Sequence, residues 1–223
     1  MASLTLLDDF LIALLVVGLP ARALWRDFRG NARTANRART YRTSILIIAT
    51  LLALLFADWL QTGRSVAALG LGWPVSLRAV GGLAFATGAL LILVATASRP
   101  RQRTVTIEQQ ASIDRLMPQG ALETRYFVAF GLLAGFGWEV LFRGFLLFVL
   151  IPPLGQVAAV TTSALSYGLG HGMRSRSQAV QSVLAAFAFT LAYVLTQNLW
   201  GLILVHAALP FVGLLAAQRA TPR

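Results

Sequence analysis

The chain is a succession of long apolar runs separated by segments rich in arginine. About 20 apolar residues suffice, as a helix, to cross a hydrocarbon core of ~30 Å. Seven runs come near that length and are predicted to be helical spans: Leu4–Leu24, Ser44–Leu60, Leu77–Ala97, Tyr126–Ile151, Leu154–Leu169, Ala179–Leu195 and Asn198–Ala217. The sequence therefore predicts an all-α, polytopic transmembrane bundle of about seven spans.

Composition supports a surface that faces lipid. Apolar residues make up 57% of the chain and charged residues 12%, whereas a soluble domain has about 45–50% and roughly 25%. We therefore predict a single integral membrane domain over residues 1–223, with membrane lipids as partners. The absence of cysteine excludes disulfides and thiolate metal sites.

The arginines predict the topology, because cytoplasmic loops carry an excess of positive charge. If all seven runs span, one side of the membrane holds sixteen of the nineteen arginines, and the other side holds only Arg64 and Arg78. This asymmetry places the N-terminus outside and the C-terminus in the cytoplasm. The remaining arginine, Arg143, lies within a span.

The net charge of +11 does not by itself indicate a nucleic-acid partner. The arginines lie between apolar runs rather than along an amphipathic face, so lipid phosphates are the expected partners. All basic residues are arginine and none is lysine, which is a weak sign of a GC-rich bacterial genome. The predicted location is therefore a bacterial inner membrane.

Four ionisable residues lie in or beside the predicted spans, where such side chains are costly and usually face the bundle interior. Glu139 and Arg143 are four residues apart, so they can pair on one helix face. His206 lies in the last span and His171 near the end of the fifth. A structural ion pair and two packing histidines would explain each residue alone; together they favour one shared site.

The segments around these residues carry three motifs. They read GWEVLFRG at residues 137–144, YGLGH at residues 167–171 and HAALP at residues 206–210. Over roughly Ala121–Ala217, predicted as the core, the chain resembles the CPBP (Abi) family of CAAX proteases and bacteriocin-processing enzymes. Those proteins carry E-E-x-x-x-R-G, then F-x-x-x-H, then H-x-x-x-N or H-x-x-x-D.

The resemblance implies an intramembrane endopeptidase. In the family, the first glutamate and the first histidine activate a water for attack on a peptide bond. The second histidine and the Asn or Asp help to stabilise the oxyanion. Glu139 then corresponds to the second glutamate, Arg143 to the arginine, and His171 and His206 to the two histidines.

Two positions depart from the family pattern. Trp138 stands at the first glutamate, and an indole N–H donates but cannot accept a proton. Pro210 stands at the Asn/Asp position and supplies no side-chain donor. Tyr167 in place of Phe is a milder change. Pairing with Arg143 would also weaken Glu139 as a replacement base.

These features leave two functional interpretations open. The first is a catalytically impaired relative that serves as a binding or assembly subunit together with other integral membrane proteins. The second is an active endopeptidase that processes a membrane-associated peptide or protein. Zinc is possible in the second case, because Glu139, His171 and His206 could supply three ligands and leave one position open.

Overall fold

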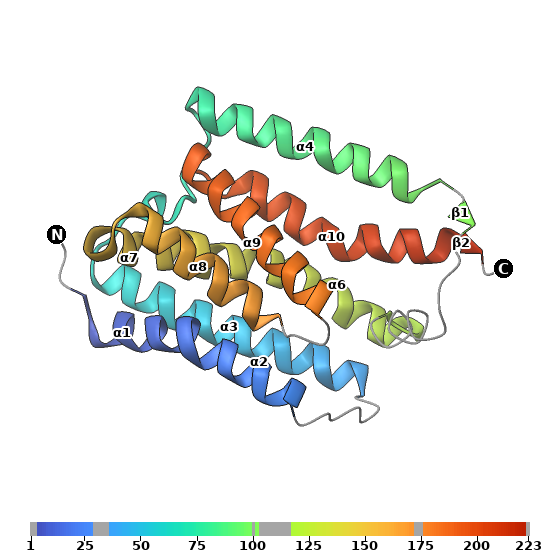
Figure 1. The fold of residues 1–223 in the computed structure, drawn as a ribbon, viewed down its shortest axis with the longest axis horizontal. Helices are drawn as coiled ribbons and strands as arrows, with labels where there is room; N and C mark the ends of the chain where they lie inside the picture. Colours follow the sequence, from blue (N-terminus) through green and yellow to red (C-terminus); the bar gives the residue numbers. More distant parts are fainter. Residues whose placement is uncertain (1–3, 29–35, 100, 103–116, 172–175, 222–223) are drawn as a thin grey trace.

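The computed structural model describes residues 4–28, 36–99, 101–102, 117–171 and 176–221. Within them the chain forms seven continuous helical segments that lie side by side as a bundle (Figure 1). Three segments precede the central helix: α1 (Leu6–Ala13) continuing through the π-helical turn η1 (Leu14–Gly18) into α2 (Leu19–Phe28), then α3 (Arg37–Gln61), and α4 (Leu77–Ala97). A 3₁₀ turn, η2 (Val66–Leu69), lies between α3 and α4.

The central helix and three further segments complete the bundle. They are α6 (Gly120–Glu139) continuing through the π-helical turn η3 (Val140–Phe145) into α7 (Leu146–Leu154), then α8 (Gln156–Gly170), α9 (Arg176–Thr196) and α10 (Trp200–Arg219). The strands found are the two-residue pair β1 (Arg101–Gln102) and β2 (Ala220–Thr221), which run parallel. The predicted helical membrane bundle is therefore confirmed.

Five helices of the described residues are long and apolar enough to cross a membrane: α3, α4, the continuous α6–α7, α9 and α10. The other two predicted spans are also helical. The segment Leu6–Phe28 includes five charged residues, which are Asp8, Asp9, Arg22, Arg26 and Asp27. Helix α8 has 15 residues and reaches only about 22 Å, less than the ~30 Å hydrocarbon core.

The continuous helix α6–α7 is the centre of the bundle. In an apolar stretch of 18 residues within this helix, 78% of the residues are buried. The corresponding share is at most 33% in each of the other four candidate spans. It was predicted to stop at Pro152, but its last turn includes both prolines and it ends at Gly155, whose φ is +77°. The residues of the first predicted motif are therefore the most enclosed part of the protein.

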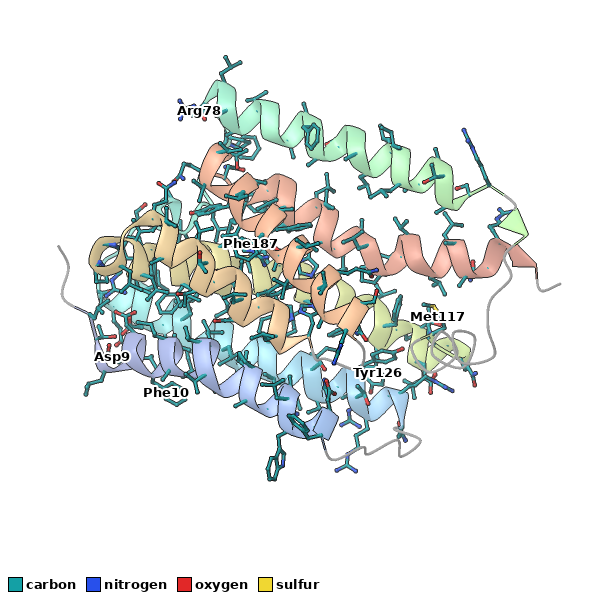
Figure 2. All side chains as sticks on the ribbon, in the orientation of Figure 1. Asp9, Phe10, Arg78, Met117, Tyr126 and Phe187 are labelled. Atoms are coloured by element: carbon teal, nitrogen blue, oxygen red, sulfur yellow. The ribbon has the colours of Figure 1, made fainter. Side chains whose placement is uncertain are left out.

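The two ends of the bundle differ in charge. Asp9 and Arg78 lie at one end, and Met117 and Tyr126 lie toward the other, where the arginine-rich segments begin and end (Figure 2). This separation agrees with the arginine asymmetry of the sequence. We name the second end the basic end; its assignment to the cytoplasm remains a prediction.

A buried ionic cluster closes the opposite end. Arg64 donates to both oxygens of Asp8 at 2.9 and 2.7 Å and lies 3.6 Å from Asp58. Thr5 donates its hydroxyl to Asp58 at 2.8 Å and also caps α1. The cluster joins the start of α1 to the end of α3. The sequence indicated Arg64 only as one of two arginines on the outer side.

Candidate functional site

Glu139 and His206 meet at the centre of the bundle. The Nδ1 atom of His206 lies 2.6 Å from Oε1 of Glu139, whose side chain is fully buried. A carboxylate accepts hydrogen bonds, so Nδ1 carries the proton. The contact depends on Gly135, one turn before Glu139, because a Cβ there would collide with the backbone of Ala207. A small residue thus lets α6 and α10 approach closely.

Arg143 completes an ion pair with Glu139. Its Nη1 lies 3.3 Å from Oε1 of Glu139, as the four-residue spacing predicted. Its Nη2 donates to the backbone carbonyl of Ala186 in α9 at 3.3 Å. The π-helical turn η3 begins directly after Glu139, and such turns occur frequently at functional sites. The arginine therefore ties the central helix to α9.

Tyr167 joins this network from α8. Its hydroxyl lies 3.1 Å from Nε2 of His206. Because Nδ1 of His206 is bound to Glu139, the hydrogen bond with the tyrosine hydroxyl occupies the remaining ring nitrogen. The guanidinium of Arg143 lies 4.2 Å from the centre of the Tyr167 ring, which is cation–π geometry. Tyr167, His206, Glu139 and Arg143 form one connected set, which we call the central network.

His171 lies beside the central network. Its Nδ1 donates to the backbone carbonyl of Tyr167 at 3.0 Å, and the two rings are 4.4 Å apart. The residue is exposed at the end of α8, but desolvation by the protein around its ring lowers the pKa of His171, an effect opposed by the bond to Tyr167. Because Nδ1 makes this bond, Nε2 is the ring nitrogen left to interact with other groups.

Trp138 faces a cavity rather than the central network. The cavity has a volume of about 210 Å³, and its lining includes Arg22, Arg26, Ser44, Trp138, Tyr167 and His171. Successive residues of a helix point about 100° apart, which turns Trp138 to the cavity and Glu139 inward. The structure thus places Trp138, Tyr167 and His171 in the lining of one cavity, and Tyr167 also belongs to the central network.

Pro210 lies one turn beyond His206, and α10 continues through it. Its ring packs near Gly131 of α6, and it is not among the residues that line the cavity. Of the six sequence-predicted site residues, Pro210 is thus the one that takes part in packing alone. The sequence analysis noted Tyr167 only as a mild departure from Phe and missed its hydrogen bond to His206. The hydroxyl that distinguishes Tyr from Phe could have indicated this bond.

The proposed zinc ligands do not form a metal site in this arrangement. Among the residues that the structure describes, no group of three or more His, Asp and Glu side chains is placed to hold a metal ion. Both ring nitrogens of His206 are engaged, one by Glu139 and the other by Tyr167. As placed here, His206 has no ring nitrogen left for a metal ion, and zinc bound by Glu139, His171 and His206 stays a prediction.

The fold and the central network define a polytopic helical membrane protein with a buried Glu–His–Arg site. Residues 121–212 match the family described as type II CAAX prenyl endopeptidase Rce1-like. All three motifs lie within this segment, and the match confirms the resemblance to the CAAX proteases there. The protein is thus an integral membrane protein that is similar to the CAAX proteases over this segment. A comparison with curated proteins and one with solved structures gave no match.

Proposed function

We propose that the protein is a non-catalytic CAAX protease-like protein that serves as a binding or assembly subunit of a membrane protein complex. One observation carries this proposal. Glu139, the one glutamate left of the family pair, is fully buried and held by His206 at 2.6 Å and Arg143 at 3.3 Å. No Asp or Glu is among the described residues that line the cavity.

Peptide hydrolysis needs a base within about 2.6–3.2 Å of the attacking water. Trp138, on the cavity wall at the family position of that base, cannot accept a proton. His206 is unavailable as well, since the Tyr167 hydroxyl occupies its Nε2. On this proposal the chain lacks a base at the position of Trp138, and His206 cannot act as the second histidine of the family.

Stabilisation of an oxyanion needs a donor aimed at the developing charge. Pro210, at the family position of Asn or Asp, has no such donor and packs near Gly131 instead. An oxyanion in the cavity would therefore lack the partner that the family supplies there. Base and oxyanion residue are lost together, which favours a bundle retained for a role other than cleavage.

A second pocket supports partner binding. It has a volume of about 280 Å³ and lies among α4, α9 and α10, with the small residues Ala79, Gly82, Ala86, Ala89 and Gly201 in its lining. Small residues allow close approach of another transmembrane helix. Helix α4 contacts mainly α10 and α9 and forms one outer side of the bundle (Figure 1).

Gentle solubilisation tests the proposal. A partner membrane protein should co-purify in fixed stoichiometry, and Ala89→Trp, which fills the second pocket, should reduce its recovery. Ala84→Trp is the matched control, because Ala84 is exposed on the same helix but does not line the pocket. A clean monomer with measurable peptidase activity would contradict the proposal.

The alternative is an active endopeptidase, and one observation favours it. Oε2 of Glu139 has no hydrogen-bond partner among the described residues, so this oxygen is free to accept a proton. His171→Ala and Glu139→Gln should then each abolish cleavage by purified protein, and His171→Ala should do so while the protein still accumulates. Cleavage that survives both substitutions rules out this alternative.

Location is part of the same proposal. The arginine asymmetry supports a bacterial inner membrane with the basic end in the cytoplasm. Cysteine labelling with a membrane-impermeant reagent tests it, since the chain has no cysteine of its own. A cysteine at Gly63, between α3 and α4, should react from outside. One at Ser98, just after α4, should not react until the membrane is opened.

A further inference from the structure

The cavity beside Trp138 has an excess of positive charge. Helix α2 lines it with Leu19, Arg22, Ala23 and Arg26, a spacing that forms one helix face. No acidic side chain belongs to the described lining. Arg26 lies 3.5 Å from Asp27, but half of its side chain is exposed, so this pair does little to cancel the charge. The cavity is therefore suited to an anion.

Two other residues of α2 indicate that this cavity lies at the level of the membrane surface. Trp25 and Phe28 are 60% and 84% exposed, and neither lines the cavity. Tryptophan is enriched at the level of the lipid headgroups. The arginines of the same turns thus lie at headgroup depth, where phosphates of anionic lipids are concentrated.

The size and walls of the cavity restrict the ligand further. Its volume of about 210 Å³ is below the ~300–1,000 Å³ that is usual for drug-sized ligands. The site therefore accepts only one end of a long molecule. The apolar residues Ile47, Phe130 and Phe142 share the lining with the arginines, so this end combines an anionic group with adjoining hydrocarbon.

We propose that this cavity binds the phosphate of an anionic membrane lipid. The guanidinium groups of Arg22 and Arg26 hold the phosphate oxygens, and the apolar wall contacts the beginning of the acyl chains. Arginine suits this task because its planar group binds phosphate through two parallel hydrogen bonds. The inference goes beyond the proposed function, since a lipid can occupy the cavity whether or not the protein has a partner or cleaves peptides.

Tryptophan quenching by brominated lipids tests the proposal on the full chain in vesicles. Phosphatidylglycerol or phosphatidylcholine, brominated near the headgroup end of the chains, is titrated into an unbrominated phosphatidylcholine background. The difference between the wild type and Trp138→Phe isolates the Trp138 signal. Phosphatidylglycerol should quench that signal at a mole fraction roughly tenfold lower than phosphatidylcholine, as expected for two arginines near a charged headgroup.

A double variant tests whether the preference for phosphatidylglycerol over phosphatidylcholine depends on the arginines of the cavity. Arg22→Gln with Arg26→Gln should bring the two lipids within about twofold of each other. Arg39→Gln with Arg99→Gln removes the same charge from exposed positions outside the cavity and should keep the preference. If the double variant Arg22→Gln with Arg26→Gln cannot be reconstituted into vesicles, Arg22→Gln alone is used. It should lower the preference for phosphatidylglycerol over phosphatidylcholine about threefold.

Two results would overturn the proposal. Equal quenching by both lipids in the wild type would show that the arginines do not select a charged headgroup. Loss of the quenching when inorganic phosphate is added would show a site for free phosphate rather than for a lipid. Neither result bears on peptidase activity or co-purification, so failure of this inference is distinguishable from failure of the proposed function.

Discussion

Replacing Glu139 by glutamine tests how the central network is held together. The substitution keeps the size of the side chain and an oxygen that can accept from His206, but it removes the charge opposite Arg143. Both partners are fully enclosed, with side-chain exposures of 0% and 1%. Removing one partner of a buried ion pair costs about 3–5 kcal/mol, because the other charge stays buried without compensation. We therefore expect a loss of about 3 kcal/mol in the free energy of unfolding.

A double-mutant cycle separates the pair from other effects of the substitution. Arg143→Met removes the cation, and the double variant leaves no buried charge at the pair. The double variant should recover most of the stability, with an interaction energy of at least about 2 kcal/mol. Unfolding in mild detergent with increasing denaturant, followed by tryptophan fluorescence, measures all four proteins.

The refuting result is a small effect. If Glu139→Gln alone costs less than about 1 kcal/mol, Arg143 does not depend on Glu139 and the pair behaves like an exposed one. The matched control is Glu123→Gln, because Glu123 is also paired with an arginine, Arg37, at 2.9 Å, with side-chain exposures of 20% and 25%. That variant should lose clearly less stability than Glu139→Gln, because a pair near the surface is screened by solvent.

Three further predictions follow from the same contacts. Tyr167→Phe removes the hydroxyl that is hydrogen-bonded to His206; it should cost about 0.6–1.5 kcal/mol of stability and shift the imidazole ¹⁵N resonances in labelled protein. Arg64→Gln leaves two buried carboxylates without their cation and should lower stability by about 3 kcal/mol in denaturant unfolding, whereas the exposed Arg78→Gln should change it by less than about 0.5 kcal/mol. Trp138→Glu returns a base to the cavity and should raise hydrolysis of a fluorogenic peptide above the wild-type background; identical rates would contradict the hypothesis that loss of the base at this position limits hydrolysis.

The sequence predicted the elements well, because apolar length is a strong signal in membrane proteins. The third predicted span, Leu77–Ala97, coincides with α4, and the central helix, α9 and α10 were predicted to within a few residues at most ends. The two segments outside the five candidate spans are those where the signal is weakest: Leu6–Phe28 carries five charges, and α8 has only 15 residues. Length alone could not decide whether they cross the membrane.

The site was predictable only in part. The spacing of Glu139 and Arg143 was enough to predict their pairing, since it depends on one helix. The 2.6 Å contact of Glu139 with His206 depends on the close approach of α6 and α10 at Gly135, which no local pattern reveals. The roles of Tyr167 and of the α2 arginines have the same origin, because each depends on which helices become neighbours.

In the non-catalytic role that we propose, the central network stabilises the bundle and leaves its groups unavailable for a reaction. Buried polar groups in a membrane need partners, and a catalytic site must leave some of its groups free to receive a substrate. Here Arg143 and His206 are bound to Glu139, and Tyr167 occupies the other nitrogen of His206. The tyrosine hydroxyl thus takes the position on His206 that a reacting oxygen would need. Stability of the network and reactivity at His206 compete for the same atom, and this chain favours stability.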